Sequence, residues 1–370
     1  MDNDKFMFRA IELAKKGIGW AAPNPMVGAV IVKNNKIIGE GFHRKCGELH
    51  AERNAFASLC ESAEGADLYV TLEPCCHFGK TPPCTQAIIQ NKIARVFIGS
   101  RDPNPLVSGK GAAILREHGI EVYEDFLRDE CDKLNPVFFK YITTKTPYTV
   151  IKYAMTLDGK IASYTGKSKW ITEEPARKHV HSLRSHYSAV MAGIGTVLAD
   201  DPMLNCRLDN AHQPLRVIVD SKLRISPESK ICSTARDYPT MVACVNPDKE
   251  KKQTLEKLGV QVTVVKEKDG HVDLKALMSI LGQMEISGVL IEGGGEINDS
   301  ALRAGIVDHV YAYIAPKIMG GKDAKTPVEG IGADSPDHAQ ILVNPEITLL
   351  GRDILIEYDV LGGFNVHGNN

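Results

Sequence analysis

The sequence predicts an α/β protein with two domains, residues 1–145 and 146–370. Short apolar runs of strand length alternate with stretches of helical period along most of the chain, which is typical of sheets covered by helices. Between residues 135 and 147 the alternation is interrupted by two prolines and a threonine-rich stretch, which indicate a junction. A chain of 370 residues is long enough for two domains with separate cores.

In the first domain, apolar residues recur at helical spacing from Phe6 to Ala14, and Gly17 ends this helix. Asn34-Asn35 separates two strand-like runs, which predicts a hairpin. The predicted elements after the first helix are strands at 26–32 and 36–42, a helix at 50–60, a strand at 67–72, a helix at 85–91, a strand at 95–99, a helix at 111–118 and a strand at 120–123. This order predicts a mixed sheet with helices on both faces.

The second domain repeats the alternation and then changes character. Strands are predicted at 148–153, 189–192, 215–219, 240–245, 260–265 and 288–291, and helices at 174–186, 273–284 and 296–304. Three further strands, at 309–314, 346–350 and 354–358, follow one another without helices between them. We expect these last strands to close the sheet in antiparallel pairs.

Composition excludes several functional classes. A hydrophobic fraction of 43% and a charged fraction of 24% are ordinary for a globular enzyme. The formal net charge of -2 and an aromatic fraction of 6% disfavour nucleic-acid binding. The 9 cysteines show no disulfide-like spacing, and no secretory signal or membrane-spanning run is visible. We therefore expect a cytoplasmic protein without nucleic-acid or membrane partners.

Three residues with zinc-binding atoms and one free carboxylate form the most informative motif. Glu52 follows His50 by two positions, and Cys75 and Cys84 each follow a proline. One imidazole and two thiolates leave a fourth zinc position open for water, whose pKa the metal lowers toward neutrality. Glu52 can reach such a water and transfer its proton to a substrate ring. The motif therefore predicts a zinc-dependent deaminase.

Each part of this motif has a plainer interpretation. A His-x-Glu triplet alone is common on helix surfaces. Cys76 and His77 are competing ligands or loop braces, and if either closed the coordination shell the zinc would be structural. Eight residues separate the two chosen cysteines, whereas the general signature has two. We favour Cys75 and Cys84 because each follows a proline at a possible helix start, where the helix dipole stabilises a thiolate.

The second domain contains a weaker nucleotide-binding motif. The predicted strand at 288–291 leads through Glu292 into Gly293, Gly294 and Gly295 and then a predicted helix. Glycines there let backbone N–H groups approach a pyrophosphate at the helix N-terminus, but they suit a tight strand–helix turn equally well.

Charged residues elsewhere in the second domain suit phosphate groups. Ser221, Lys222 and Arg224 fit a ribose 2′-phosphate, which favours NADP over NAD, although a solvated charged turn is the ordinary alternative. Arg184 and Arg207 suit a substrate phosphate, or else form surface ion pairs.

Taken together, the motifs resemble those of a known family. They are residues 41–52 (Gly-Phe-His-Arg-Lys-Cys-Gly-Glu-Leu-His-Ala-Glu), 23–28 (Pro-Asn-Pro-Met-Val-Gly), the Thr-Pro-Pro-Cys that ends at Cys84, and 196–202 (Thr-Val-Leu-Ala-Asp-Asp-Pro). Over nearly its whole length the chain resembles the bifunctional riboflavin biosynthesis proteins, which fuse a diaminohydroxyphosphoribosylaminopyrimidine deaminase to a 5-amino-6-(5-phosphoribosylamino)uracil reductase. The resemblance implies a cytidine-deaminase-like three-layer first domain with a mixed sheet and a dihydrofolate-reductase-like α/β second domain. It also implies Zn²⁺ and NADPH as cofactors.

Site residues follow from the resemblance by matching motifs. It implies zinc ligands at His50, Cys75 and Cys84 and a catalytic proton carrier at Glu52. It implies NADPH contacts at Ala154, Trp170, Thr196, Asp200, Ser221, Gly294 and Gly295. It implies substrate contacts at Ser168, Arg184, Leu204, Arg207 and Glu292, with the two arginines on the 5′-phosphate. Lys152 and Asp158 are further candidates, although a salt bridge or a strand-end charge explains either.

The resemblance implies two successive reactions. The first is hydrolytic deamination of 2,5-diamino-6-ribosylamino-4(3H)-pyrimidinone 5′-phosphate at the carbon that bears the 2-amino group. The second is reduction of the ribosyl group of 5-amino-6-(5-phosphoribosylamino)uracil to ribityl, with a hydride passing to C1′. The alternative for the first domain is a single-function deaminase of cytosine or adenine, free or in RNA, which the near-neutral charge and the large second domain oppose. The family also implies a homo-oligomer.

Overall fold

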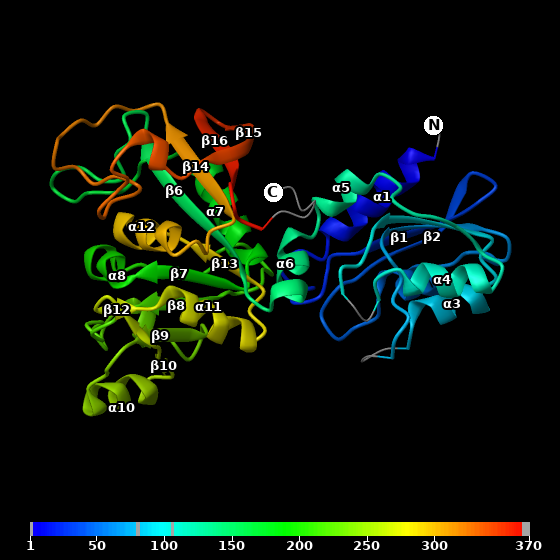
Figure 1. Ribbon diagram of the computed structural model, residues 1–370, viewed down its shortest axis with the longest axis horizontal. Coiled ribbons are helices and arrows are strands. Elements are labelled where there is room, and N and C mark those ends of the chain that lie inside the picture. Colours follow the sequence, from blue (N-terminus) through cyan, green and yellow to red (C-terminus); the bar gives the residue numbers. More distant parts are fainter. Residues whose placement is uncertain (1–2, 79–81, 105–106, 365–370) are drawn as a thin grey trace. The chain divides into compact units, whose positions relative to one another are not determined.

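The computed structural model describes residues 3–78, 82–104 and 107–364 (Figure 1). Its internal contacts divide the chain into two compact units, Met1–Lys145 and Thr146–Asn370. Each unit has its own large sheet. None of the helices in the described ranges combines the length and the apolar character that a membrane span requires.

The first unit contains a five-stranded mixed sheet of order β2-β1-β3-β4-β5. β1 pairs antiparallel with β2 and β3, whereas β3, β4 and β5 run parallel. The strands are β1 (Gly28–Lys33), β2 (Lys36–Phe42), β3 (Asp67–Leu72), β4 (Arg95–Ser100) and β5 (Glu121–Tyr123). The helices are α1 (Asp4–Lys15), α2 (Ala51–Ala57), α3 (Cys84–Gln90), α4 (Lys110–Glu117), α5 (Arg128–Asp132) and α6 (Pro136–Thr144).

Helices cover both faces of this sheet, because neighbouring strand residues point to opposite sides. On one face, Val30 and Tyr69 pack with apolar residues of α1. On the other face, Ile31, Leu68 and Val70 pack with apolar residues of α2, α3 and α4. The predicted three-layer arrangement and mixed sheet are confirmed.

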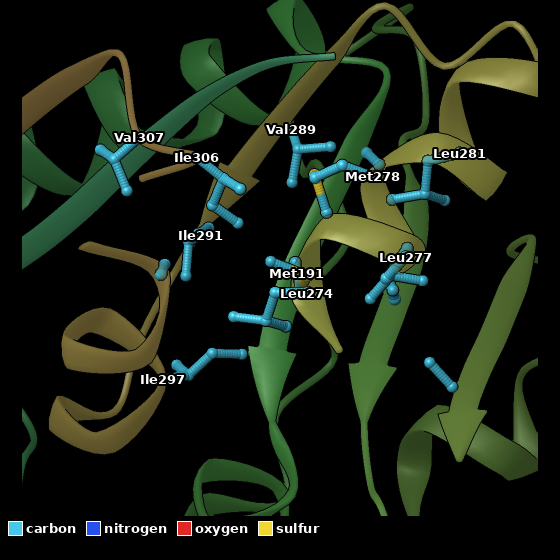
Figure 2. Close-up of a cluster of buried hydrophobic side chains, with 14 of the residues drawn as sticks. Met191, Leu274, Leu277, Met278, Leu281, Val289, Ile291, Ile297, Ile306 and Val307 are labelled. Atoms are coloured by element: carbon cyan, nitrogen blue, oxygen red, sulfur yellow. The ribbon is translucent and has the colours of Figure 1, made fainter. Parts of the chain in front are cut away.

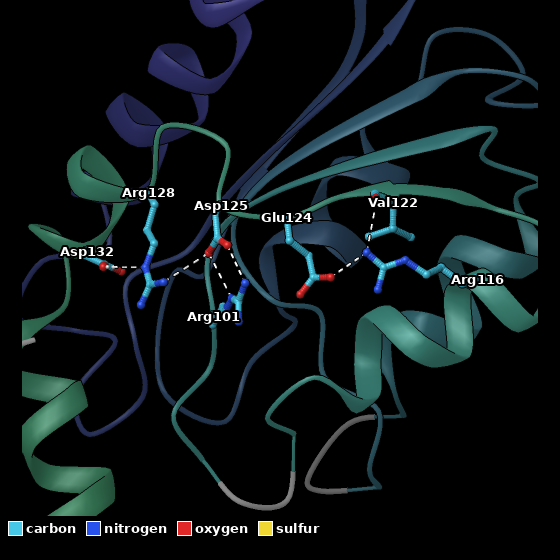
Figure 3. Close-up of polar contacts among 7 residues, drawn as sticks. All are labelled: Arg101, Arg116, Val122, Glu124, Asp125, Arg128 and Asp132. Atoms are coloured by element: carbon cyan, nitrogen blue, oxygen red, sulfur yellow. Dashed lines mark hydrogen bonds and ion pairs between the residues drawn. The ribbon is translucent and has the colours of Figure 1, made fainter. Parts of the chain in front are cut away.

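Ion pairs join the segments that follow β4 and β5 (Figure 3). The Asp125 carboxylate accepts hydrogen bonds from Arg101 Nε at 3.0 Å and from Arg128 Nη1 at 3.3 Å. Arg128 Nε also donates to Asp132 Oδ2 at 3.2 Å. Exposed pairs of this kind contribute at most about 1 kcal/mol each to stability. Their main effect is positional, since Arg101 immediately precedes the loop that leaves β4.

The second unit contains a nine-stranded mixed sheet of order β10-β9-β8-β7-β13-β6-β14-β16-β15. The strands from β10 to β14 in this order run parallel, and β16 pairs antiparallel with β14 and β15. The strands are β6 (Tyr148–Thr156), β7 (Ala189–Gly193), β8 (Leu215–Val219), β9 (Thr240–Cys244), β10 (Gln261–Val264), β13 (Gly288–Ile291), β14 (His309–Ala315), β15 (Leu342–Leu350) and β16 (Asp353–Val360), with β11 (Glu267–Lys268) and β12 (His271–Val272) in a separate ribbon. The helices are α7 (Glu174–His186), α8 (Ile194–Asp200), α9 (Lys230–Ser233), α10 (Lys249–Lys257), α11 (Leu274–Gln283), α12 (Gly295–Arg303) and the 3₁₀ helix η1 (Pro336–His338).

This sheet is also covered on both faces. Leu277 and Met278 of α11 and Ile297 of α12 pack against Met191 and Ile291 of the central strands (Figure 2). On the opposite face the sheet contacts α7. His179 Nδ1 in this helix lies 2.7 Å from the hydroxyl of Tyr313 in β14. The hydroxyl of Tyr187, just after the helix, lies 3.4 Å from that of Tyr311. Tyr311 and Tyr313 alternate with the inward Val310 along β14, as the period of a strand requires. The α/β class is confirmed for this unit as well.

The boundary between the two units, after Lys145, lies within the predicted junction at residues 135–147, but this segment contains a helix that the sequence did not predict. Most of that segment is helix α6, which begins with Pro136 and buries Phe138, Phe139 and Tyr141. A proline at the first helical position costs nothing, because its missing N–H would have no partner within the helix. The short helices α5, α8, α9 and α10 were not predicted. The sequence of α10 explains why it was not predicted. Its buried residue is Leu255, the other residues are mostly charged, and no apolar stripe is present.

Candidate functional site

The three predicted zinc ligands of the first unit converge. Within the described residues, the group able to hold a metal consists of His50, Cys75 and Cys84, whose ligand atoms all lie within 4.8 Å of one another. Neither Cys76 nor His77, the competing ligands, belongs to this described group. Gly79, Lys80 and Thr81 of the motif lie outside the described residues.

The spacing of these atoms fits zinc. His50 Nδ1 lies 3.5 Å from Cys75 Sγ and 3.5 Å from Cys84 Sγ. Tetrahedral ligands with Zn–S of about 2.3 Å and Zn–N of about 2.05 Å are separated by about 3.6 Å. Both distances between the imidazole nitrogen and the sulfurs therefore match those that a shared tetrahedral ion would impose.

Two helix starts and one loop place the ligands. His50 precedes α2, and Cys84 is the first residue of α3. Cys75 does not begin a helix, contrary to the prediction, but lies in the loop after β3. Its sulfur accepts the backbone N–H of Cys84 at 3.3 Å, and its carbonyl accepts the N–H of Thr85 at 3.2 Å. These bonds tie the loop to the start of α3 and so replace the expected helical geometry.

Glu52 lies in the first turn of α2 and is buried, with 3% of its surface exposed. Burial, and next the charge of Cys75, raise the pKa of Glu52 above its usual range. A hydrogen bond from Cys84 lowers the pKa of the Cys75 thiol, while the same contact raises the pKa of Cys84. The carboxyl group is thus positioned beside the sulfurs in surroundings that favour its holding a proton.

Further polar residues surround this site. The buried His43 ring lies with its centroid 5.3 Å from that of His50, and its Nε2 is 3.2 Å from Asn24 Nδ2. Burial raises the pKa of Asp102, in the loop after β4, to about 6. Glu73 accepts the N–H groups of Gly109 and Gly111 at the start of α4. These residues were absent from the predicted site, although the position of Asp102 just beyond a strand end could have indicated it.

A second set of predicted residues lines a pocket in the second unit. Those that line it are Ala154, Ser168, Trp170, Arg184, Thr196, Asp200, Arg207, Glu292 and Gly294. Ser168 Oγ donates to Asp200 Oδ1 at 3.3 Å, which joins a predicted substrate contact to a predicted cofactor contact. Gly294 N–H donates to Thr196 Oγ1 at 2.9 Å at the start of α12.

The start of α12 has the open backbone that a pyrophosphate needs. Gly293 has φ of 99°, in the left-handed region that favours glycine, and a Cβ added there would meet no atom within 4 Å. A Cβ on Gly294 would meet only Thr196 Oγ1, at 3.5 Å. The N-terminal end of this helix is therefore accessible from the pocket, which fits a dinucleotide.

Three predicted residues do not line the pocket. The Ser221 hydroxyl accepts the N–H of Val272 at 3.0 Å. Leu204 is buried, with 3% of its surface exposed. A Cβ on Gly295 would lie 2.5 Å from Glu329 Cγ, so glycine is needed there for packing. Their roles as NADPH or substrate contacts stay predictions.

A buried ion cluster forms one wall of the pocket. Arg184 Nε and Nη2 donate to the two carboxylate oxygens of Glu292 at 2.5 and 2.9 Å, and Lys152 Nζ lies 3.5 Å from Glu292 Oε2. Burial alone would raise the pKa of Glu292, but the charges of Arg184 and Lys152 outweigh it and lower that pKa to about 2. Burial lowers the pKa of Lys152. Lys152 is thus part of the site, as its candidate status anticipated.

Asp158, the other additional candidate, has a different position. Its carboxylate accepts the N–H groups of Met319 at 3.0 Å and Gly320 at 2.6 Å, together with the hydroxyl of Thr156. These bonds lower the pKa of Asp158 to about 2. Asp158 therefore fixes the segment after β14, and it is absent from the pocket lining.

The segment 203–207 includes Leu204 and Arg207. Its backbone is fixed by hydrogen bonds with side chains from elsewhere in the second unit. Gln213 accepts the N–H of Cys206 at 3.0 Å and donates to its carbonyl at 2.9 Å. Arg184 Nη1 donates to the Asn205 carbonyl, and Arg216 Nη1 donates to that of Met203. Nothing in the local sequence indicated these partners, because they come from α7, β8 and the loop before it.

Comparisons with known proteins identify a family for each unit. The family model "Cytidine and deoxycytidylate deaminase zinc-binding region" matches residues 1–100, and "RibD C-terminal domain" matches residues 147–355. A riboflavin biosynthesis protein RibD from Actinobacillus pleuropneumoniae is 53% identical over 96% of this chain and 95% of its own length. One from Bacillus amyloliquefaciens is 44% identical over 94% of each chain.

Solved structures extend the likeness to the fold of the whole chain. RibD from Acinetobacter baumannii superposes with a TM-score of 0.87 at 38% identity, over 97% of this chain and 99% of that one. A diaminohydroxyphosphoribosylaminopyrimidine deaminase/5-amino-6-(5-phosphoribosylamino)uracil reductase from Thermotoga maritima gives a TM-score of 0.83 at 39% identity, with the same coverage. The chain belongs to the RibD family of bifunctional riboflavin biosynthesis enzymes, which join a zinc-dependent deaminase to an NADPH-dependent reductase.

Proposed function

We propose that residues 1–145 deaminate 2,5-diamino-6-ribosylamino-4(3H)-pyrimidinone 5′-phosphate and that residues 146–370 reduce the product, 5-amino-6-(5-phosphoribosylamino)uracil. The observation that carries the first assignment is the convergence of an imidazole, two thiols and a buried carboxyl group. The matches of the two family models to residues 1–100 and 147–355 support the division of labour.

In the first domain, His50, Cys75 and Cys84 would hold zinc. The ion supplies a Lewis acid that makes water nucleophilic at neutral pH. Glu52 takes the proton of the attacking water, passes it to a ring nitrogen of the pyrimidine and later delivers a proton to the departing ammonia. Its burial in the first turn of α2, two residues after His50, supports this role, because a proton carrier must lie beside the zinc-bound water.

In the second domain, the residues at the start of α12, with Thr196 and Asp200, would hold NADPH. The cofactor supplies the hydride that reduces C1′ of the opened ribosyl group. Glu292 contacts the substrate as a carboxylate, since the charges of Arg184 and Lys152 keep it ionised. The open backbone at Gly293 and Gly294 supports this proposal, because it would let a pyrophosphate approach the start of α12.

We further propose that the enzyme acts in the cytoplasm as a homo-oligomer on small phosphorylated pyrimidines. Its nine cysteines are all free, which fits a reducing compartment. The edge strand β15 exposes Ile347 and Leu349, with 68% and 73% of their surfaces accessible, and an exposed apolar edge favours self-association. Sedimentation of the purified chain tests the oligomer, and a monomer at micromolar concentration would contradict it.

Separate assays of the half-reactions test the main proposal. The purified chain should release ammonia from the diaminopyrimidine phosphate without NADPH, and should oxidise NADPH only once the deaminated product is present. Release of ammonia from cytidine at a comparable rate, or oxidation of NADPH by the undeaminated substrate at a comparable rate, would contradict it.

A further inference from the structure

Helix α2 has a fixed position beside the zinc ligands. It begins directly after His50 and places Glu52 in its first turn. Its backbone also lies very close to that of β2, because a Cβ added to Gly41 would come within 2.3 Å of the Ala55 nitrogen. A group that is hydrogen-bonded to α2 is therefore held at a defined position relative to both His50 and Glu52.

The side chain of Asn54 fixes the backbone on the His50 side of this helix. Its Nδ2 donates to the carbonyl of Phe42 at 2.8 Å and to that of Leu49 at 3.1 Å. Leu49 immediately precedes His50, and its carbonyl oxygen also lies 3.1 Å from His43 Nδ1. The segment that leads into the first zinc ligand is thus tied to α2 by a side chain of α2 itself.

The side chain of Arg53 makes the corresponding connection to the segment before Cys84. Its Nε donates to the carbonyl of Pro82 at 3.1 Å, and its Nη2 donates to the carbonyl of Pro83 at 3.0 Å. These two prolines directly precede Cys84, the first residue of α3. A proline has no backbone N–H, so hydrogen bonds can hold these residues only at their carbonyl oxygens. Arg53 provides such a bond to each of them.

A guanidinium suits this task better than an ammonium group. Its N–H groups lie in one rigid plane, so two of them can hold two carbonyl oxygens at a fixed separation. The Cys84 N–H donates to Cys75 Sγ at 3.3 Å, so the position of this segment also affects the second sulfur. Arg53 bonds to backbone oxygens rather than to a ligand atom. Its effect on a metal ion would therefore come through the positions of the two sulfurs.

We propose that Arg53 is a positioning residue for the zinc site, which holds Cys84 at the distance from His50 that the ion requires. That distance is 3.5 Å between Cys84 Sγ and His50 Nδ1. The assignment rests on the zinc-dependent deaminase function proposed above. Because Arg53 limits the movement of Cys84 before the ion binds, the ligands lose less freedom on binding it. Zinc then binds more tightly and dissociates more slowly.

Measurements of zinc affinity on the full-length enzyme test this assignment. The variants are Arg53→Ala, Arg53→Lys and, as a matched control, Arg116→Ala. Arg116 also lies in a helix of the first unit, and its Nη2 donates to a backbone carbonyl, that of Val122, at 3.2 Å (Figure 3). Competition with a chromophoric chelator gives the dissociation constant for zinc, and transfer to excess chelator gives the dissociation rate. Far-UV circular dichroism checks that each variant is folded.

Arg53→Ala should weaken zinc binding and speed its dissociation about tenfold, the lower end of the range for residues that orient metal ligands. Its ammonia release should rise when zinc is added in excess. Arg53→Lys should lose only about threefold in affinity, because an ammonium group can still donate to one of the two carbonyls. Arg116→Ala should agree with the wild type within about twofold, as most surface substitutions do.

Two results would overturn the proposal alone. Wild-type affinity and dissociation rate in Arg53→Ala would mean that the sulfurs are held without Arg53. An equal loss in Arg116→Ala would mean that the first unit is loosened in general. If Arg53→Ala does not fold, Arg53→Lys decides, since a threefold loss supports the proposal and wild-type affinity contradicts it. A wild type that binds no zinc would instead refute the proposed deaminase function, and this inference with it.

Discussion

The zinc site and the reductase pocket differ in how far apart in sequence their residues lie. His50 and Cys84 are separated by 34 positions, and every predicted ligand is part of one short pattern. In the pocket, Glu292 and its partner Arg184 are separated by 108 positions, and the lining residues come from across the second unit. The zinc site could therefore be predicted from the types of its residues. The reductase pocket, in contrast, depends on which side chains the fold brings together.

Loss of a zinc ligand should give the largest effect and the sharpest separation of the two sites. In Cys84→Ala, zinc content should fall from about one ion per chain to near zero and ammonia release below detection, because structural and catalytic zinc needs its full ligand set. Reductase turnover with supplied intermediate should remain. Metal analysis and the two assays check this, with the exposed Cys60→Ala as the matched control. Full deaminase activity in a zinc-free variant would refute the site.

Glu52→Gln should leave the ion bound and remove the proton carrier. We expect ammonia release to fall at least about a hundredfold, the usual contribution of a general acid and base. Zinc content and NADPH oxidation should stay at wild-type levels, and the exposed Glu61→Gln is the control. Unchanged ammonia release would mean that Glu52 has no part in the reaction.

Arg207→Ala should affect the other site alone. The KM for the phosphorylated intermediate should rise between about 10-fold and 100-fold, because a hydrogen bond to a charged group contributes about 1.5–3 kcal/mol. Ammonia release should be unaffected, since Arg207 belongs to the second unit. Kinetics of both half-reactions measure this, alongside the exposed Arg236→Ala. Parallel losses in the two reactions would indicate misfolding instead.

Gln213→Ala should show whether the dispersed site depends on its supporting bonds. Without Gln213 the backbone of Cys206 loses both of its amide partners, and the neighbouring Arg207 becomes less fixed. We expect a rise of about threefold to tenfold in the reductase KM with a smaller change in kcat. The exposed Gln283→Ala serves for comparison. A KM equal to that of the wild type would mean that the segment is held well enough by its other contacts.

The smallest expected effect concerns stability in acid. Burial lowers the pKa of His186 to about 4, against about 6.5 in the unfolded chain, so the unfolded state binds more protons between these values. Stability of the second unit should therefore fall as pH falls from about 6.5 to about 4. Between pH 7 and pH 5 the free energy of unfolding should fall in the wild type by an amount that is smaller, by on the order of 1 kcal/mol, in His186→Gln and unchanged in the exposed His271→Gln. An identical loss in His186→Gln would contradict the assignment.

The sequence by itself predicted much of this protein correctly. The family, the bifunctional enzyme class, the cofactors Zn²⁺ and NADPH and the α/β class are confirmed. Every predicted strand is present, because a short apolar run bounded by turn residues is the pattern expected of a buried strand. Short length alone does not explain the missed helices, because α2 and α3 have seven residues each and were predicted. In α10 the missing signal is an apolar stripe.

Tertiary structure alone decided how the generic polar residues are used. Arginine, glutamate, lysine and histidine occur in pocket and surface alike, and only their placement showed that Arg184 and Lys152 hold Glu292. Likewise, only the structure showed that both ring nitrogens of His181 lie within hydrogen-bond distance of Arg207. Zinc selects its ligands by atom type, which a sequence records directly, whereas an ion pair or a phosphate site depends on distance and burial, which arise only when separate strands and helices have packed.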